Sequence, residues 1–475
     1  MRNRETQQGG RVHRRRFLTT LAAGAAVGSA LGRDGRASPT DTSKPASTGK
    51  SWKLDVTIYD RPGWTSTCFG LPVMKRKSGD LGVGFQAQRE DAMTDDFYTA
   101  HAEWVFLTSS NSGRSWELAS FDDMPLDPRW SHRSAHCTHG WPVELDNGTL
   151  INVVEVTPTP EELKERLERL GIGHLWFPDS TFGWDLWPAS HAERLKAEGV
   201  YVFDKPGVWL PDGVVATHNR QPPVTHSRDG GRTWEERRIE GLPTFSRYGA
   251  WFRGGIVLRD GTVLGAVYGT IRTDARFGRS GHASSYAVRS TDEGRNWEIS
   301  TIGHDATEKV IYNETNLLEL PSGRVLALVR GRGGRLFQSH SDDSGKTWTP
   351  PKMTRIGGSP ANLLRLRSGK ILCVYRNRGY PSGYRGVLSH DDGETWDVDR
   401  EIVICDDTLP GLVGYPSSVE LDDGTIFTLY NVMRVGALKP DDEWSYKTNL
   451  VIRPPLHSYI AGSSYTENYT RPLGT

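Results

Sequence analysis

The chain has 475 residues, of which 52 are glycine and 16 are tryptophan. This length would hold two or three average domains, but an all-β architecture built from repeats can absorb it as one. The 58 basic and 58 acidic residues balance, yet residues 1–38 carry a net charge of +6, so the remainder is acidic at −6. An acidic remainder argues against a nucleic-acid partner.

The N-terminus explains this asymmetry. Arg14-Arg15-Arg16 precedes the small, apolar run Leu21–Leu31, which is too short to span a membrane as a stable helix. A twin-arginine pair before such a run is typical of a Tat export signal. We therefore expect a signal peptide at residues 1–37, a disordered Ser/Thr/Pro-rich spacer at residues 38–50, and a propeller domain over residues 51–475. The mature protein is expected to be periplasmic or extracellular, with no membrane span.

The cysteines offer no clear framework. Cys68, Cys137, Cys373 and Cys405 are far apart, and none forms a Cys-x-x-Cys pair. Isolated buried thiols are favoured, with one disulfide as the alternative in an oxidising compartment.

A short motif, Ser-x-Asp-x-Gly-x-x-Trp, recurs five times and predicts a tight turn. The Asp carboxylate accepts bonds from backbone N–H groups of the turn, Gly supplies a positive φ, and Trp fills the gap between neighbouring units. The motif resembles the Asp-box of sialidase-type β-propellers, and this resemblance implies a structural role. The copies are Ser109–Trp116 (with Asn111 in place of Asp), Ser227–Trp234, Ser290–Trp297, Ser341–Trp348 and Ser389–Trp396.

A second repeat gives the number of blades. An apolar strand, a turn and another apolar strand recur at Leu71–Phe85, Val143–Val154, Ile256–Val267, Leu317–Val329, Leu363–Tyr375 and Val419–Tyr430. The sixth unit has no box; we expect its third strand at Asn449–Pro454 and its fourth from the N-terminal segment Trp52–Tyr59, which would close the ring. The fold class predicted is all-β, a six-bladed β-propeller.

The order of strands assigns two faces. The turns between strands 1 and 2 and the box turns share one face. The loops between strands 2 and 3 and the links between blades share the other. Functional residues should therefore lie where first strands begin, where second strands end, and in the connections beyond.

One connection is unusually long. The loop between strands 2 and 3 of the second blade runs from about 157 to 220 and predicts a helical insertion. A capping box at Thr159–Glu162 opens one helix, and Ser190–Glu193 opens a second that stops near Gly199. The aromatic residues between the helices favour either a lid over the channel mouth or a small satellite core.

The face rule selects a set of candidates rich in arginine. Guanidinium groups bind carboxylates through two bonds, so this set suggests an anionic substrate, although single rim arginines are more often solvated or paired. The candidates are Arg89, Asp91, Asp95, His136, His139, Arg247, Tyr248, Arg272, Asp274, Glu314, Arg330, Arg332, Arg376, Arg378, Arg385 and Tyr415.

Two further motifs, together with the boxes, resemble exo-sialidases (neuraminidases) over roughly residues 65–434. Asn313-Glu314, followed by a hairpin ending at Arg330, resembles the family's Asn-Glu motif and its second clamp arginine. Gly414-Tyr415-Pro416-Ser417-Ser418 resembles its nucleophilic tyrosine motif. This resemblance implies that Tyr415 is the nucleophile, Glu314 its general base and Arg330 a ligand of the substrate carboxylate.

The chemistry is coherent for such a substrate. A carboxylate on the anomeric carbon would repel a carboxylate nucleophile, whereas a neutral tyrosine avoids this when a Glu beside it takes the proton. An Asp would protonate the leaving oxygen; the family position favours Asp95, with Asp91 second. The third clamp arginine is expected at Arg378 or Arg385.

One position departs from the family. Sialidases open the first blade with Arg-Ile-Pro, whereas this chain has Gly70-Leu71-Pro72. Arg61, Arg247 or Arg272 would have to replace the missing arginine. If none does, a different acidic sugar or a neutral one would fit better than sialic acid.

A histidine cluster is the one group with metal-like spacing. His132, His136 and His139 lie beside Cys137 at intervals that would suit zinc on a helix. This segment instead links two blades and enters a strand at Trp141. We therefore expect no metal or other cofactor, and interpret His139 as catalytic or sugar-binding.

Three functions fit these patterns. The first is an exported retaining glycosidase that removes terminal sialic acid or a related acidic sugar from glycans. The second is a propeller polysaccharide lyase acting on uronates, and the third is a glycan-binding propeller without catalysis. In all three cases we expect the partner to be a glycan or a small sugar.

Overall fold

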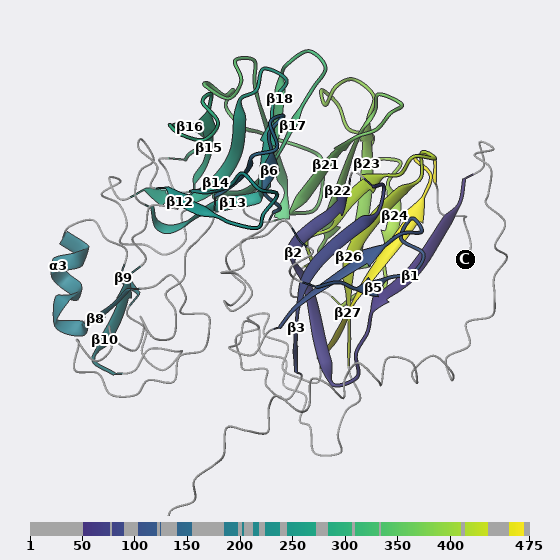
Figure 1. The fold of residues 1–475 in the computed structure, drawn as a ribbon, viewed down its shortest axis with the longest axis horizontal. Coiled ribbons are helices and arrows are strands. Elements are labelled where there is room, and N and C mark those ends of the chain that lie inside the picture. Colours follow the sequence, from purple (N-terminus) through teal and green to yellow (C-terminus); the bar gives the residue numbers. More distant parts are fainter. Residues whose placement is uncertain are drawn as a thin grey trace, which may run out of the picture. The chain divides into compact units, whose positions relative to one another are not determined.

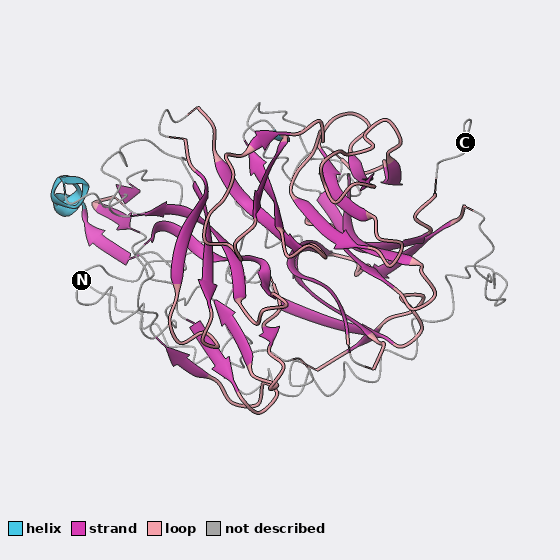
Figure 2. Ribbon diagram, turned by 90° about the horizontal axis from the view of Figure 1, so that it is seen from above, coloured by secondary structure: helices cyan, strands magenta, loops and turns pink. Residues whose placement is uncertain are grey.

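The computed structural model describes residues 51–76, 78–89, 103–120, 124, 140–153, 185–197, 202–203, 212–217, 224–237, 245–271, 284–305, 309–331, 334–409, 414–435 and 456–469. The predicted signal peptide and spacer lie outside this part. The described residues form six four-stranded antiparallel sheets and one of three strands (Figures 1 and 2).

The six larger sheets are the blades of a six-bladed β-propeller, as predicted. Blade 1 contains β2 (Trp64–Lys75), β3 (Leu81–Arg89), β4 (Glu103–Ser109) and β5 (Glu117–Leu118). Blade 2 contains β6 (Val143–Glu144), β7 (Leu150–Val153), β11 (Val224–Ser227) and β12 (Glu235–Arg237). Blade 3 contains β13 (Phe245–Val257), β14 (Val263–Ile271), β15 (Ser284–Ser290) and β16 (Glu298–Gly303).

The remaining blades follow the same order of strands. Blade 4 contains β17 (Tyr312–Glu319), β18 (Val325–Gly331), β19 (Leu336–Ser341) and β20 (Lys352–Met353). Blade 5 contains β21 (Ala361–Arg365), β22 (Ile371–Asn377), β23 (Gly383–Ser389) and β24 (Ile402–Cys405). Blade 6 contains β25 (Ser417–Glu420), β26 (Ile426–Val435), β27 (Leu456–Tyr465) and β1 (Lys53–Tyr59).

Blade 6 closes the ring with a strand from the other end of the chain. β1 pairs antiparallel with β27, from Lys53 opposite Tyr465 to Tyr59 opposite Ile460. The predicted closure is therefore confirmed. Pairing of the two ends leaves no blade with an unfinished fourth strand.

The predicted third strand of blade 6 was wrong. It is β27 rather than Asn449–Pro454, which lies outside the described residues. β27 did not stand out because it is rich in small polar residues that are buried between strands. Ser458 donates to the Ser66 carbonyl at 2.7 Å, and a Cβ on Gly462 would lie 2.5 Å from the Phe427 ring. Ser458 and Gly462 show that β27 requires small side chains here rather than apolar ones.

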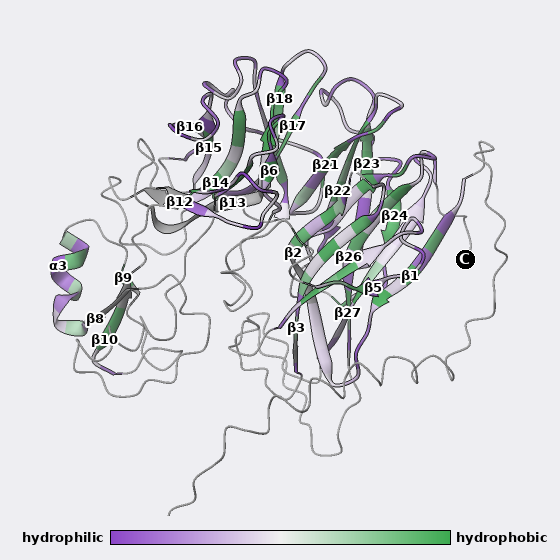
Figure 3. Ribbon diagram, in the orientation of Figure 1, coloured by the Kyte–Doolittle hydropathy of each residue, from purple (hydrophilic) through white to green (hydrophobic). Residues whose placement is uncertain are grey.

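Hydrophobic clusters join neighbouring blades. Leu264 of blade 3 and Val325 of blade 4 share one cluster, and Leu81 of blade 1 and Phe427 of blade 6 share another. Middle strands such as β18 and β22 are therefore buried on both faces and read as nearly continuous apolar runs. In Figure 3 the green hydrophobic segments fall on strands, while many connecting loops are purple.

The Asp-boxes form the predicted turns. In the fourth box, Gly345 N donates to Ser341 Oγ at 2.8 Å, and Thr347 N donates to Asp343 Oδ1 at 2.8 Å. Trp348 donates its Nε1–H to the Gly345 carbonyl at 3.2 Å and packs against the cluster shared with blade 3. Four of the five box tryptophans bond to their own turn in this way, whereas Trp396 of the fifth box donates to Gln338 Oε1 of blade 4. Trp348 also fills the gap to the preceding blade.

The insertion in blade 2 contains more sheet than predicted. The expected second helix is present as η6 (Ala189–His191) continuing into α3 (Ala192–Ala197). β8 (Asp185–Pro188), β10 (Val214–Thr217) and β9 (Val202–Phe203) form the three-stranded sheet, beside which Figure 1 shows α3. The first predicted helix lies outside the described residues. Among the residues that the structure describes, no helix is long and apolar enough to cross a membrane.

Close approach between blades should make Gly345 intolerant of any side chain. Its φ is +85°, and a Cβ would lie 2.6 Å from Leu264 Cδ1. Gly323 has a similar φ of +88° but open space around it, so it isolates the cost of backbone strain. We expect Gly323→Ala to cost about 1 kcal/mol, and Gly345→Ala to cost about 1–3 kcal/mol more in urea unfolding. Equal losses would show that the two blades separate freely here.

The fourth box should also give the fold an acid dependence. Burial raises the pKa of Asp343. Hydrogen bonds from Thr347 and Ser341 more than offset this effect and lower the pKa to about 2. Because this folded-state pKa is below the unfolded value of 3.8, the stabilisation is complete above about pH 4 and is lost as the pH falls towards 2. Asp343→Asn should therefore lower the Tm at neutral pH and have little effect near pH 2. Asp399→Asn, which removes a surface carboxylate paired with Arg355, is the control; a pH-independent loss in Asp343→Asn would contradict the argument.

Candidate functional site

A backbone irregularity at the start of blade 4 directs Glu314. Asn313 pairs with Arg330, and the register between β17 and β18 then shifts before Asn316. Glu314 lies in this bulge with a φ of +22°, a backbone conformation that costs a non-glycine residue energy. Such strain is typical of positions where the direction of a side chain matters.

Glu314 contacts both Arg330 and Tyr415, the residues that were expected beside it. Arg330 Nη1 donates to Glu314 Oε2 at 2.5 Å, and the Tyr415 hydroxyl donates to Glu314 Oε1 at 2.8 Å. Glu314 and Tyr415 are buried, with 6% and 5% of their surfaces exposed. The two carboxylate oxygens of Glu314 therefore accept from different parts of the ring. Oε2 accepts from Arg330 of blade 4, and Oε1 accepts from Tyr415, just before blade 6.

Neighbouring groups keep Arg330 positively charged. Burial lowers the pKa of Arg330, but the Glu314 carboxylate and the Tyr415 hydroxyl more than offset this effect and raise it overall. Arg330 therefore stays protonated and forms an ion pair with the Glu314 carboxylate. An ionised Glu314 is suited to accept the Tyr415 proton.

Arg378 brings a second guanidinium to the same place. It follows β22 directly, at the end of the second strand of blade 5. Burial, Arg330 and Arg376 lower its pKa, while Glu314 and Tyr415 oppose this effect. Among the described residues, Arg378 Nε and Nη2 are buried without a hydrogen-bond partner. Within the described part of the chain, two guanidinium groups thus face one carboxylate, that of Glu314, and this excess of positive charge favours an anionic ligand.

Two other predicted arginines direct their donors elsewhere. Arg376 is fully buried; its Nη1 donates to Tyr384 Oη at 3.3 Å and its Nη2 to the Leu409 carbonyl at 3.1 Å. Arg385 Nη1 donates to the Cys405 carbonyl at 2.6 Å. Of the two candidates for the third clamp arginine, the structure brings Arg378 rather than Arg385 into electrostatic contact with Tyr415.

For the remaining candidate residues, the structure gives only a position on a strand or does not describe the residue. Arg89 is exposed at the end of β3. Arg247 and Tyr248 lie on β13, opposite Thr270 and Gly269. Asp91, Asp95 and His139 lie outside the described residues, as do His132 and His136. No group of His, Cys, Asp and Glu within the described part of the chain could hold a metal ion.

Tyr268 was missed at the sequence level. It lies near the end of β14, the second strand of blade 3, and contributes to the raised pKa of Arg330. The rule that active residues lie at the ends of second strands pointed to this position. Tyr268 therefore joins Arg330, Arg378, Glu314 and Tyr415 in one site assembled from blades 3 to 6.

The comparisons agree with this fold. The family model of the BNR repeat-like domain matches residues 199–428. The match confirms the predicted resemblance to sialidase-type Asp-box (BNR) propellers. No curated protein matches the chain.

Solved structures are similar to this chain at low identity. A protein of unknown function from Dyadobacter fermentans is 21% identical, with a TM-score of 0.60 over 90% of this chain and 100% of that one. The NanB sialidase from Streptococcus pneumoniae is 15% identical, with a TM-score of 0.47 over 87% and 69%. An α-L-arabinanase from Penicillium chrysogenum is 12% identical, with a TM-score of 0.46 over 87% and 98%.

Removal of Arg330 should destabilise the propeller through Glu314. Arg330→Met leaves a buried carboxylate without its ion pair, which typically costs about 3–5 kcal/mol. Adding Glu314→Gln removes the unpaired charge, so the double variant should regain part of this loss. Arg355→Met, which breaks an exposed pair with Asp399, should cost less than about 1 kcal/mol in the same denaturant titration. A double variant no more stable than Arg330→Met would show that the charge is not the cause.

Proposed function

We propose that the protein is a retaining exo-glycosidase that removes a terminal acidic sugar, sialic acid or a related one, from glycans. The observation that carries this proposal is the hydrogen bond from the Tyr415 hydroxyl to Glu314, next to two arginines. A phenol needs a base to become a nucleophile at neutral pH, and Glu314 accepts its proton directly.

The arginines account for the choice of nucleophile. In the proposed complex, Arg330 and Arg378 hold the carboxylate on the anomeric carbon of the sugar. A carboxylate nucleophile would be repelled by that group, whereas the neutral Tyr415 is not. The Nε–H and Nη2–H groups of Arg378, which find no partner among the residues that the structure describes, are suited to a planar carboxylate.

The proposed reaction has two steps. Tyr415 Oη forms a bond to the anomeric carbon as the bond to the leaving oxygen breaks; Glu314 takes the phenol proton, and an Asp protonates the leaving oxygen. Water then attacks the same carbon, the Asp takes its proton, and Tyr415 leaves and regains the proton from Glu314. We propose Asp95 for this acid and base, with Asp91 as the alternative.

The sequence also supports export. The twin arginines before an apolar run, within residues 1–37, lead us to propose a Tat-exported protein that acts in the periplasm or outside the cell. Polymeric or surface glycans would then be accessible to it.

Two substitutions test the proposed chemistry. Tyr415→Phe removes the nucleophilic oxygen, and Glu314→Gln removes the base; each should lower kcat on an aryl sialoside by at least about 100-fold. Glu319→Gln, on the same strand but bonded to the Arg259 backbone, is the control that should keep its activity.

The outcomes separate the competing functions. Hydrolysis of aryl glycosides of another acidic sugar, with sialosides untouched, would keep the mechanism and change the substrate. A product with a new ultraviolet absorbance would indicate a lyase instead. Full activity in Tyr415→Phe would exclude Tyr415 as the nucleophile.

A further inference from the structure

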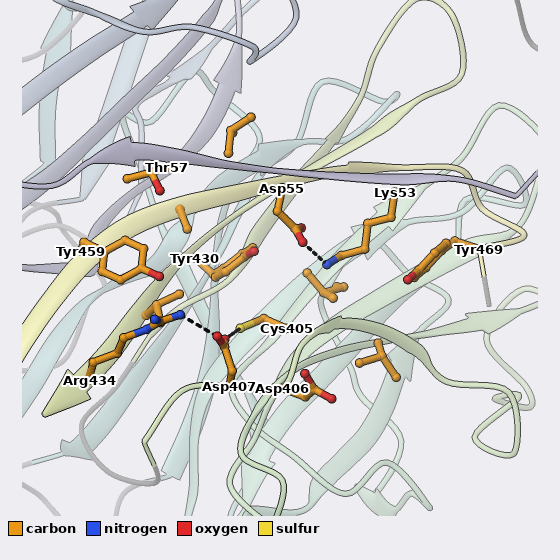
Figure 4. A pocket seen from close by; sticks show the side chains of 15 residues that line it. Lys53, Asp55, Thr57, Cys405, Asp406, Asp407, Tyr430, Arg434, Tyr459 and Tyr469 are labelled. Atoms are coloured by element: carbon orange, nitrogen blue, oxygen red, sulfur yellow. Dashed lines mark hydrogen bonds and ion pairs between the residues drawn. The ribbon is translucent and has the colours of Figure 1, made fainter. Parts of the chain in front are cut away.

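Tyr415 lies at the end of the link between blades 5 and 6, and residues of both blades bond to this link. The link comprises residues 406–416, of which 406–409 and 414–416 are described. Its first residues line a groove of about 440 Å³ between β24 and the outer strands of blade 6. Figure 4 shows Asp407 on this groove, bonded to Arg434 and Cys405. On β26, the Met433 carbonyl accepts from Leu409 N at 3.0 Å, so the start of the link is fixed from blade 6 as well as from blade 5.

A buried polar network of blades 5 and 6 also contacts the link. Tyr384 is fully buried, and its hydroxyl donates to the Asn431 carbonyl at 2.8 Å, with Asn431 Oδ1 at 3.2 Å. Arg376 donates to the same hydroxyl through Nη1 and to the carbonyl of Leu409, in the link, through Nη2. Arg376 thus connects the network directly to the link.

The network also fixes the residue before Tyr415. A Cβ on Gly414 would lie 1.9 Å from Tyr384 Oη and 2.2 Å from Asn431 Oδ1. The backbone at Gly414 is therefore packed on the Tyr384 hydroxyl itself. Any shift of that hydroxyl changes the surface on which the Tyr415 backbone rests.

We propose that Tyr384 and Arg376 are positioning residues that hold the Tyr415 hydroxyl on Glu314. The role rests on the proposed function of Tyr415 and assigns Arg376, fully buried, to the link rather than to the substrate. Reacting groups displaced by about 1 Å lose about 100-fold in rate, so a small movement of the link is enough to matter.

The matched variants are Tyr384→Phe and Tyr430→Phe. The two rings lie 5.0 Å apart in the same cluster, and each loses one buried hydroxyl. The Tyr430 hydroxyl bonds to Ser463, in β27, at 2.8 Å, so its loss tests buried hydroxyl removal without touching the link. Tyr384→Phe should lower kcat about 10- to 100-fold with KM unchanged, and Tyr430→Phe should leave both unchanged.

A second readout does not depend on the substrate. With 3-fluorotyrosine at position 415, the fluorine NMR signal should move in Tyr384→Phe and stay in place in Tyr430→Phe. The comparison remains valid if every sugar tested is inert, so failure of the proposed function and failure of the positioning role are distinguishable.

Arg376→Lys covers the case in which Tyr384→Phe does not fold. It keeps the charge near Arg378 but cannot reach both Tyr384 and Leu409 in the same geometry, so it should also lower kcat and move the fluorine signal. An unchanged signal in both Tyr384→Phe and Arg376→Lys would overturn the inference. So would equal losses of kcat in Tyr384→Phe and Tyr430→Phe.

Discussion

The pairing of β1 with β27 is the constraint on which the site depends. Glu314 and Arg330 belong to blade 4, Arg378 follows the second strand of blade 5, and Tyr415 precedes blade 6. These residues meet because each blade packs on the next and the ring is closed. If blade 6 lacked its fourth strand, its outer edge would be open, and the blade that carries Tyr415 would be less firmly held.

The features that could be predicted from the sequence are local ones. Each Asp-box makes its turn with bonds inside eight residues, so five copies identify the fold without knowledge of the neighbours. Glu314 and Arg330 could be paired because the register of one hairpin places them side by side. Tyr415 required more, since its partner is 101 residues away, and it was found through the motif that resembles the sialidase tyrosine.

The features that could not be predicted depend on contacts between blades. Arg376 and Arg378 are two residues apart at the end of one strand, where alternation alone would give them the same direction. The structure instead encloses Arg376 against Tyr384 and Leu409, and brings Arg378 into electrostatic contact with Tyr415 and Glu314. The link from blade 5 to blade 6 makes this difference, and its course is not encoded in either strand. The same reasoning applies to β27, where burial selects small side chains that look like a polar loop.

Polar groups are well paired in the boxes and less so at the site. Each box gives its Asp or Asn backbone donors, although four boxes also hold a non-glycine residue at positive φ, such as Ser344 at +58°. At the site, Glu314 adopts a positive φ without being glycine, and two nitrogens of Arg378 are buried without partners in the described part of the chain. Strain and unmet bonding capacity cost free energy and persist when the surrounding structure enforces them. Their coincidence beside a Tyr–Glu hydrogen bond supports the interpretation that these groups are arranged for an anionic ligand rather than for the stability of the fold.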